Sequence, residues 1–273
     1  MPDVKLDSFV GARVAVIGDM IHDEYLHCTS SRVSPEAPVP VCKLVKREQR
    51  AGGAGNVRNG IMALGGKVNF VCVSGPMHIK TRVVVGHHQV ARIDQEPDPV
   101  KYQAAWRTAK GDILSALRKV NVIVISDYGR MPGEIIRYTI SNAQLGQMVI
   151  VDPKRADARL YAGANIITPN SLEWQALGGK LPPGNQYALV TRGEKGMTLV
   201  RRRAKPIHFP TMARDVVDVT GAGDTVVATL AAALSAGYPL QTACELANIA
   251  AGIACSKFGT YAVDIHDLIE GNK

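Results

Sequence analysis

The residues best suited to chemistry in this sequence lie between Asp218 and Thr225, in the run Asp-Val-Thr-Gly-Ala-Gly-Asp-Thr. An apolar stretch follows at once and predicts a helix from Gly223 to Ala236. The two glycines let the backbone turn its N–H groups toward one point, and the helix dipole adds positive potential there. Such an anion hole suits phosphoryl transfer, and Asp224 at its mouth could accept the proton of an attacking hydroxyl. An Asp224 that merely caps the helix after a tight glycine turn fits the same residues.

A second glycine-rich run, Gly52-Gly53-Ala54-Gly55-Asn56, precedes a helical pattern from Ala54 to Leu64. Its glycines allow backbone to approach a ligand closely, and Asn56 can both donate and accept hydrogen bonds with hydroxyls. The spacing is not that of a dinucleotide fingerprint, and the sequence has no Walker-type Gly-Lys-Ser/Thr motif. The run therefore indicates a small polar ligand rather than a dinucleotide.

These motifs lie in a chain whose elements alternate. Continuous apolar runs predict buried strands at Val14–Ile17, Val68–Val73, Val122–Ile125, Val149–Val151, Ile166–Ile167 and Ala188–Thr191. Helical patterns follow at Ala54–Leu64, Gln103–Leu117, Pro132–Leu145, Leu172–Leu177, Gly223–Ala236 and Leu240–Ser256. This order predicts an α/β fold with a central, mostly parallel sheet and helices on both of its faces.

Two stretches break the pattern. Residues 39–45 and 81–94 show partial alternation of apolar and polar residues, as strands with one exposed face do. We expect them to form a small β lid, roughly over residues 38–48 and 79–95. No repeat or linker marks a second full domain, so residues 1–273 are predicted to form a single domain.

The composition of the chain limits the classes of molecule that it is expected to bind. The net charge of +8 could indicate nucleic acid, but aromatic residues make up only 5% and the basic residues are scattered, and an anionic small molecule explains the charge equally well. The dense cluster Arg201-Arg202-Arg203 fits a solvated hairpin turn. The seven histidines show no metal-ligand spacing. The sequence therefore predicts no partnership with nucleic acid.

Apolar runs and cysteines in the sequence indicate where in the cell the protein is located. No run approaches the ~20 apolar residues that span a bilayer, and the first ten residues lack the apolar stretch of a secretory signal. Five cysteines without a Cys-x-x-Cys pair are best explained as free thiols in a reducing compartment. We therefore expect a cytoplasmic location and no membrane partner.

The two glycine-rich runs resemble the signature motifs of the ribokinase (PfkB) family of sugar kinases. The resemblance runs almost end to end and is most specific to the heptose 7-phosphate kinases, including the kinase half of the bifunctional heptose kinase/adenylyltransferases. The matching stretches are Gly18-Asp19, residues 31–40 (Ser-Arg-Val-Ser-Pro-Glu-Ala-Pro-Val-Pro), Ser126-Asp127-Tyr128, Asp152-Pro153-Lys154, Thr168-Pro169-Asn170 and Val190-Thr191-Arg192. The resemblance implies an ATP- and Mg²⁺-dependent kinase that phosphorylates the anomeric hydroxyl of D-glycero-D-manno-heptose 7-phosphate, on the route to ADP-heptose and the lipopolysaccharide core.

The resemblance also implies the site. Asp224 would be the catalytic base, and Gly221, Ala222 and Gly223 would supply the anion hole. The nucleotide would contact Asn170, Glu173, Thr191, Arg192, Gly193, Gly196 and Asn248, with Asn170 and Glu173 placing Mg²⁺ through water. The sugar phosphate would contact Asp19, Asp23, Gly52, Gly53, Asn56, Arg82, Asp127 and Lys154.

Several of these assignments have simpler readings. Asp23 fits a solvated loop carboxylate equally well, and Asn248 fits an ordinary helix-surface amide. A phosphorylated substrate needs cations, yet each of the candidates could be a surface charge: Arg32, Lys80, Arg82, Arg130 and Lys154.

The chain also departs from the family pattern. Only Pro76-Met77-His78-Ile79 stands where the family has a helix and a strand, and residues 178–186 replace most of another helix. The shortened chain could be a kinase for a different sugar or a non-catalytic relative that binds a ligand. The family leads us to expect a homodimer formed through the lid, and a separate nucleotidyltransferase that acts on the product.

Overall fold

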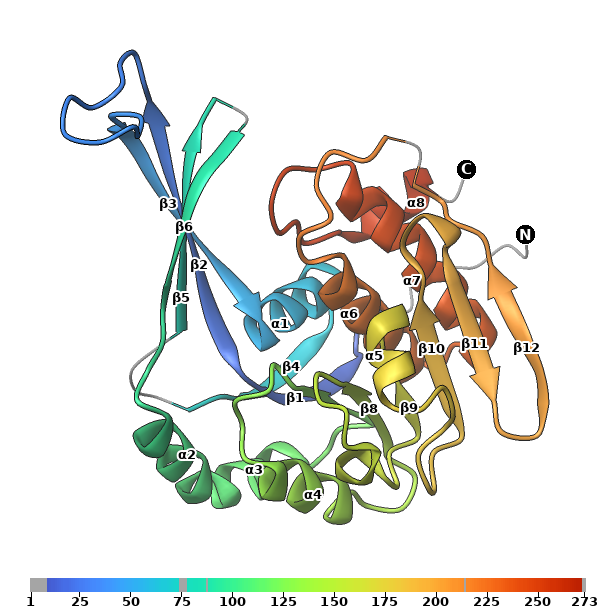
Figure 1. The fold of residues 1–273 in the computed structure, drawn as a ribbon. Helices are drawn as coiled ribbons and strands as arrows, with labels where there is room; N and C mark the ends of the chain where they lie inside the picture. The colour runs from blue at the N-terminus through green and yellow to red at the C-terminus, as the bar shows by residue number, and fades with distance from the viewer. Residues whose placement is uncertain (1–8, 74–77, 87, 214, 272–273) are drawn as a thin grey trace.

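The central sheet of the predicted α/β fold is present in the computed structural model, which describes residues 9–73, 78–86, 88–213 and 215–271. Over these residues its strand order is β12-β11-β10-β9-β8-β7-β1-β4 (Figure 1). Six strands are parallel: β1 (Arg13–Gly18), β4 (Lys67–Val71), β7 (Val122–Ser126), β8 (Met148–Asp152), β9 (Ile166–Ile167) and β10 (Tyr187–Thr191). A hairpin of β11 (Met197–Arg201) and β12 (Ala204–Phe209) adds two antiparallel strands at one edge. The parallel strands predicted from apolar runs are confirmed.

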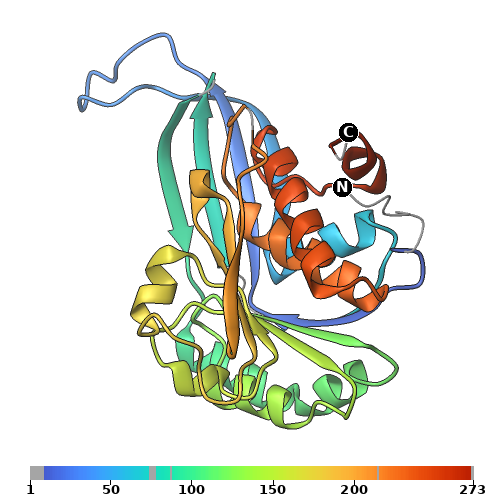
Figure 2. The same ribbon diagram turned by 90° about the vertical axis from the view of Figure 1, so that its right-hand side faces the viewer.

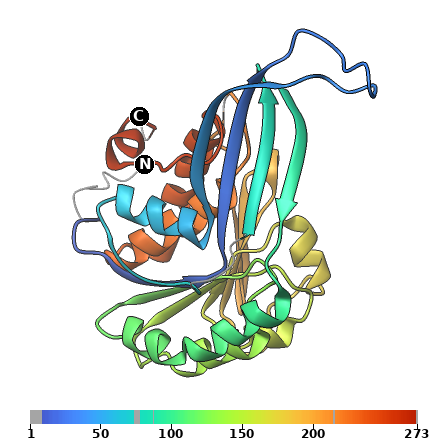
Figure 3. The ribbon, with the colours of Figure 1, turned by 90° about the vertical axis from the view of Figure 1, so that its left-hand side faces the viewer.

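Helices cover both faces of this sheet. One face carries α1 (Ala54–Ala63), α6 (Ala222–Ser235), α7 (Leu240–Cys255) and α8 (Ile265–Gly271), and the other carries α2 (Pro99–Thr108), α3 (Lys110–Ala116) and α4 (Gly133–Ser141) (Figures 1 and 3). Along β1 the side chains alternate between the two cores. Val14 and Val16 pack with α1 and α6, while Ala15 and Ile17 pack on the opposite side. The alternation follows from the period of two in a strand.

The segment from Gln103 to Leu117 is two helices rather than the single helix that was predicted. The first begins earlier, because the Asp98 side chain accepts hydrogen bonds from the N–H groups of Val100 and Lys101 at 2.8 and 3.1 Å. Pro99 in the first turn suits this start, since its missing N–H needs no partner there. Ala109 separates the two helices, because it follows the last residue of α2 and precedes the first residue of α3.

A second sheet forms the lid, with strand order β3-β2-β5-β6. Its strands are β2 (Met20–Thr29), β3 (Lys43–Gly53), β5 (His78–Val85) and β6 (His88–Gln95). β3 begins at Lys43 rather than at Val39, and β2 was not predicted as a strand. The lid rises from the main sheet beside α1 and α6 (Figures 1 and 2).

The shortened segments precede inner strands of the two sheets: His78 and Ile79 of the first begin β5, and the second precedes β10. Pro76 and Met77 of the first are outside the described residues. The second, residues 178–186, consists of turns between α5 (Ser171–Ala176) and β10. Arg202 from the tip of the β11–β12 hairpin donates hydrogen bonds to the carbonyls of Pro182 and Asn185, at 2.6 Å each. One residue of the basic cluster therefore secures the turns that replace a helix.

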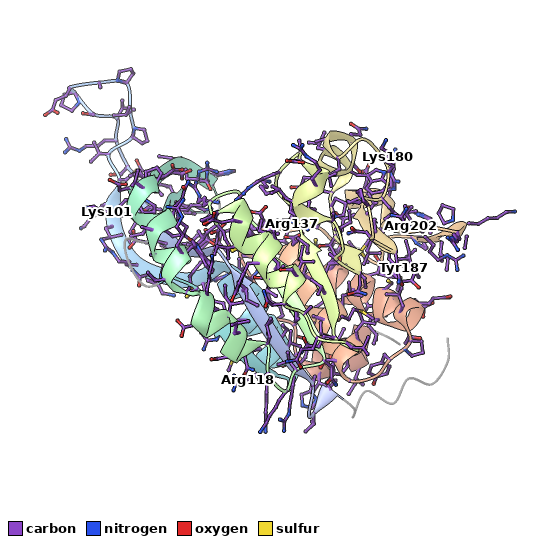
Figure 4. All side chains as sticks on the ribbon, turned by 90° about the horizontal axis from the view of Figure 1, so that it is seen from below. Lys101, Arg118, Arg137, Lys180, Tyr187 and Arg202 are labelled. Atoms are coloured by element: carbon purple, nitrogen blue, oxygen red, sulfur yellow. The ribbon has the colours of Figure 1, made fainter. Side chains whose placement is uncertain are left out.

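The basic side chains on the face seen from below come from separate elements. Figure 4 labels Lys101 on α2, Arg118 after α3, Arg137 on α4 and Lys180 after α5, spread across the molecule. All five cysteines are free. None of the helices in the described part of the chain is long and apolar enough to cross a membrane.

Candidate active site

The two glycine-rich motifs meet at the start of two helices. Asn56 Nδ2, in the first turn of α1, donates a hydrogen bond of 3.0 Å to Asp224 Oδ2, in the first turn of α6. Gly221 makes this contact possible, because a Cβ atom there would lie 2.7 Å from Asn56 Nδ2. Its φ of +79° also favours glycine. Residues 168 positions apart thus form one buried pair.

Asp224 is almost fully buried, with 5% of its surface exposed. Burial raises the pKa of its carboxyl group to about 6, against the opposing effect of the hydrogen bonds from Asn56 and Tyr128. The Tyr128 hydroxyl donates to Asp224 Oδ1 at 2.7 Å. A carboxylate whose pKa lies near neutrality is suited to accept a proton from a hydroxyl. The reading of Asp224 as a simple N-cap does not hold, since the N-cap residue of α6 is Gly221.

A cavity of about 440 Å³ opens directly beside Ala222 and Gly223. The residues predicted for the nucleotide that also line it are Thr191, Gly193, Gly196 and Asn248. Apolar side chains form much of the remaining wall, among them Met197, Val216, Val219 and Val226. An apolar slot that ends at helix amides can hold a flat ring at one end and phosphates at the other.

Arg192, like Asn170 and Glu173, lies outside the lining of this cavity, whereas Asn248 is part of it. The Nε of Arg192 donates to Thr198 Oγ1 at 3.0 Å. Asn248 lines the wall but is 7% exposed, and its Nδ2 donates to the Pro210 carbonyl at 2.6 Å. Asn248 is therefore a buried amide that ties α7 to the segment after β12, rather than a helix-surface amide.

Asp23 lies on the lid and faces inward. It is a buried residue of β2, paired with Arg82 of β5 through Nη1 and Oδ1. Gly52 gives the carboxylate its space, since a Cβ atom at that position would lie 2.2 Å from Asp23 Oδ2. Asp23 is thus no solvated loop carboxylate, and its ion pair with Arg82 brings two of the predicted sugar residues together.

Asp19, predicted to contact the sugar, is fully buried at the junction of β1 and β2. Its carboxylate accepts hydrogen bonds from the Tyr102 hydroxyl at 2.9 Å and from three backbone N–H groups, those of Tyr128, Arg130 and Met131, at 3.1, 3.2 and 3.2 Å. With no exposed surface and four donors, Asp19 fixes the loop after β7 instead of lining a cavity.

Asp127 has a similar environment. Its carboxylate is 2% exposed and accepts from the Tyr161 hydroxyl at 2.7 Å, the Gly129 N–H at 2.7 Å and Arg155 Nη2 at 3.2 Å. The prediction that Asp127 contacts the sugar does not match this placement. The carboxylate instead holds the loop after β7 to the segment after β8.

A comparison with known families covers more than half of the chain, including the glycine-rich motif from Asp218 to Thr225. The model of the pfkB family carbohydrate kinases matches residues 98–267. The chain belongs to this family. The kinase is 40% identical over 311 aligned residues to the bifunctional protein HldE of Nitrosococcus oceani and 39% identical over 308 to that of Pseudomonas aeruginosa. These alignments cover 96% and 97% of the kinase but 64% of each relative.

Solved structures match in fold at low sequence identity. Arabidopsis thaliana ribokinase complexed with ribose and ATP has a TM-score of 0.74 and 19% identity, over 97% of the kinase and 99% of that chain. Phosphofructokinase-2 from Escherichia coli in complex with potassium has a TM-score of 0.73 and 17% identity, over 96% and 97%. The ribokinase-like fold predicted from the sequence is confirmed, in a shortened chain.

The side chains whose oxygens are predicted to place Mg²⁺ in the kinase lie at the start of α5. Asn170 Oδ1 accepts from the N–H groups of Leu172 and Glu173, and Glu173 Oε2 accepts from the Asn170 N–H at 2.9 Å. Lys154 Nζ lies 3.1 Å from Glu173 Oε1. Carboxylate and amide oxygens are of the type that Mg²⁺ prefers. Because both side chains also cap the helix, contact through water fits them best.

Two residues of the site were not predicted. Tyr128 contacts Asp224, and Asp152 lies at the carboxyl end of β8, where it accepts from Thr168 Oγ1 at 2.9 Å. Burial and the charge of Asp224 raise the pKa of Asp152 well above its usual range. Asp152 ends a buried strand and Tyr128 follows one, both within stretches that match the family, and carboxyl ends of parallel strands share one edge of a sheet. Position after a strand was the signal that could have identified them.

Proposed function

We propose that this kinase transfers the γ-phosphoryl group of ATP to the anomeric hydroxyl of D-glycero-D-manno-heptose 7-phosphate, giving the 1,7-bisphosphate. The observation that carries the phosphoryl-transfer assignment is the buried Asn56–Asp224 pair, which sets a carboxylate beside the helix amides and the 440 Å³ cavity. The heptose assignment rests on the resemblance of residues 31–40 and on the identity to HldE proteins.

In the proposed reaction, Asp224 accepts the proton of the sugar hydroxyl while that oxygen forms its bond to the γ-phosphorus. The bond from the γ-phosphorus to the bridging oxygen breaks, and ADP leaves with the electron pair. The backbone N–H groups from Gly221 to Gly223, at the positive end of α6, stabilise the negative charge that develops. Bound Mg²⁺, held through Asn170 and Glu173, would neutralise phosphate charge.

The sugar is proposed to lie between the lid and the first turn of α1. Asp23 and Asn56 offer acceptors and a donor for hydroxyls, and Gly52 and Gly53 let the backbone come close. The 7-phosphate would be drawn by cations near the lid, of which Arg82 is held in place by Asp23. Lys80, Arg130 and Lys154 are further candidates.

A homodimer formed through the lid is part of the proposal. Large apolar side chains are exposed on its outer strands: Leu44 and Val45 of β3, and Val90 and Ile93 of β6. Exposed apolar patches of this kind are typical of association surfaces. We further propose that a nucleotidyltransferase outside residues 1–273 consumes the product.

The test is ADP release by the purified protein with Mg²⁺-ATP and a panel of acceptors: heptose 7-phosphate, ribose and fructose 6-phosphate. The proposal predicts turnover with the heptose phosphate that exceeds turnover with the other sugars. A preference for another sugar would contradict the proposed substrate but support the proposed kinase activity. Binding of nucleotide without ADP release from any sugar, by protein shown to be folded, would favour a non-catalytic relative.

A further inference from the structure

Both oxygens of the Asp224 carboxylate are held by protein donors, and one of these donors comes from outside the glycine motifs. Tyr128, in the loop after β7, donates its hydroxyl to Oδ1 at 2.7 Å, while Asn56 donates to Oδ2 at 3.0 Å. Two donors, one from the first turn of α1 and one from the loop after β7, fix the plane of the carboxylate. Because a carboxylate offers about four lone-pair positions, acceptor capacity remains for a substrate hydroxyl.

The ring of Tyr128 is seated by the motif that carries Asn56. A Cβ atom at Gly53 would lie 3.3 Å from Tyr128 Cε2, so the ring packs over the glycine backbone. Gly53 also has a φ of +59°, which a larger residue would rarely adopt. Gly53 therefore both starts α1 and leaves space for the tyrosine.

The loop that carries Tyr128 is in turn held by Asp19. Asp19 Oδ2 accepts from the backbone N–H groups of Tyr128, Arg130 and Met131, and Tyr102 donates to Oδ1. Asp19 is fully buried and cannot touch a substrate in this structure. Any effect of Asp19 on the reaction must therefore pass through the loop.

We infer that Tyr128 is a positioning residue for phosphoryl transfer: it orients Asp224 toward the acceptor hydroxyl, and Asp19 holds Tyr128 in place. The inference rests on the proposed function, in which Asp224 is the base. Burial and the charges of Asp224 and Asp152 raise the pKa of Tyr128 well above its usual range, so the phenol remains a donor.

The test compares Tyr128→Phe with Tyr261→Phe across a pH series of ADP release. Tyr261 is the matched control, because its hydroxyl donates to Asp267 Oδ2 at 3.0 Å, near α8 and outside the site. Tyr128→Phe should lower kcat by about 10- to 100-fold, as expected for the loss of one hydrogen bond to a charged group. It should also move the acid limb of kcat/KM to higher pH, since that hydrogen bond lowers the pKa of Asp224. Tyr261→Phe should change neither quantity.

Unchanged kcat and an unchanged pH profile in folded Tyr128→Phe protein would overturn the inference. Asp19→Asn, in protein with a cooperative unfolding transition, should shift the profile in the same direction. A loss of kcat without that shift would contradict the claim that Asp19 acts by holding Tyr128 in place.

The inference can fail independently of the proposed function. If the wild-type protein released no ADP from any sugar, the ¹³C-NMR titration of the Asp224 carboxyl carbon would still test the contact. A higher pKa of Asp224 in Tyr128→Phe than in wild type supports it, and equal values reject it.

Discussion

At Asp224, burial and hydrogen bonding act on one carboxylate in opposite directions, and burial has the larger effect. The pKa in the folded protein, about 6, lies above the ordinary value of 3.8. The folded state therefore binds the proton more tightly than the unfolded state does. The contribution of Asp224 to stability is therefore highest below about pH 4 and is lost as the pH rises through about 6. The protein thus holds a carboxylate in a position where its negative charge is unfavourable. Catalytic groups often have pKa values perturbed in this way.

Asp224→Asn should therefore stabilise the protein at neutral pH. The amide removes a buried charge but can still accept from Asn56 and donate to Tyr128. We expect the free energy of unfolding at pH 7.5 to rise by roughly 1–3 kcal/mol, from a pKa shift of about two units. Urea unfolding at pH 7.5 and pH 4 measures this, with a smaller difference at pH 4. A variant less stable than wild type at pH 7.5 would show that the carboxylate is a structural group.

The residue types at the centre of the site could be predicted, but their contacts could not. Glycines followed by a helix indicate an anion hole, and an Asp or Asn beside them indicates hydroxyl chemistry. The sequence alone does not show tertiary contacts, so it could not reveal that Asn56 and Asp224 touch. The resemblance to the family implied that Asp19 and Asp127 contact the sugar. The structure surrounds both with backbone and tyrosine donors, and only the fold could reveal this.

At the scale of elements, the strands that matched the prediction are those with continuous apolar runs. β2 was missed because it contains His22, Asp23 and Glu24. The two carboxylates are buried and are satisfied by neighbours on another strand. Asp23 pairs with Arg82, and Glu24 accepts from Thr81 Oγ1 at 2.8 Å. A strand with buried charged side chains on both faces shows no apolar signal, so its position depends on partners far along the chain.

The turn before α6 offers a test of how an element positions the site. Gly221→Ala would place a Cβ atom 2.7 Å from Asn56 Nδ2 at a φ of +79°. Gly237→Ala is the matched control, because its φ is +90° but no atom lies within 4 Å of the added Cβ. Both variants should lose about 1 kcal/mol of stability from the backbone conformation.

Only Gly221→Ala should lose activity, by about 100-fold or more, because it separates Asn56 from Asp224. Unfolding curves and ADP release measured on the same preparations distinguish the two effects. Equal activity in the two variants would mean that the Asn56–Asp224 contact does not matter for turnover.

At the scale of the whole molecule, the lid has two surfaces with different roles. Its inner surface carries Asp23 and Arg82, and its outer strands expose Val45 and Ile93. The combined variant Val45→Lys/Ile93→Lys should shift the protein from dimer to monomer, because charges oppose burial of this surface. Leu145→Lys is the control, since Leu145 is fully exposed on the turn after α4.

Light scattering at several concentrations measures the mass of each variant. Wild type and Leu145→Lys should have the mass of a dimer. A wild-type protein that remains monomeric at all concentrations would contradict the proposed association.

The central claim is that Asp224 is the base, and its most direct test is ADP release by Asp224→Asn beside wild type, with ATP affinity measured for both. The account predicts that turnover falls by about 10³-fold or more while ATP affinity stays within a few-fold, because Asp224 follows Gly223 in the chain but does not itself line the cavity proposed for the nucleotide. Turnover in Asp224→Asn close to that of wild type, or an equal loss of ATP affinity, would contradict it.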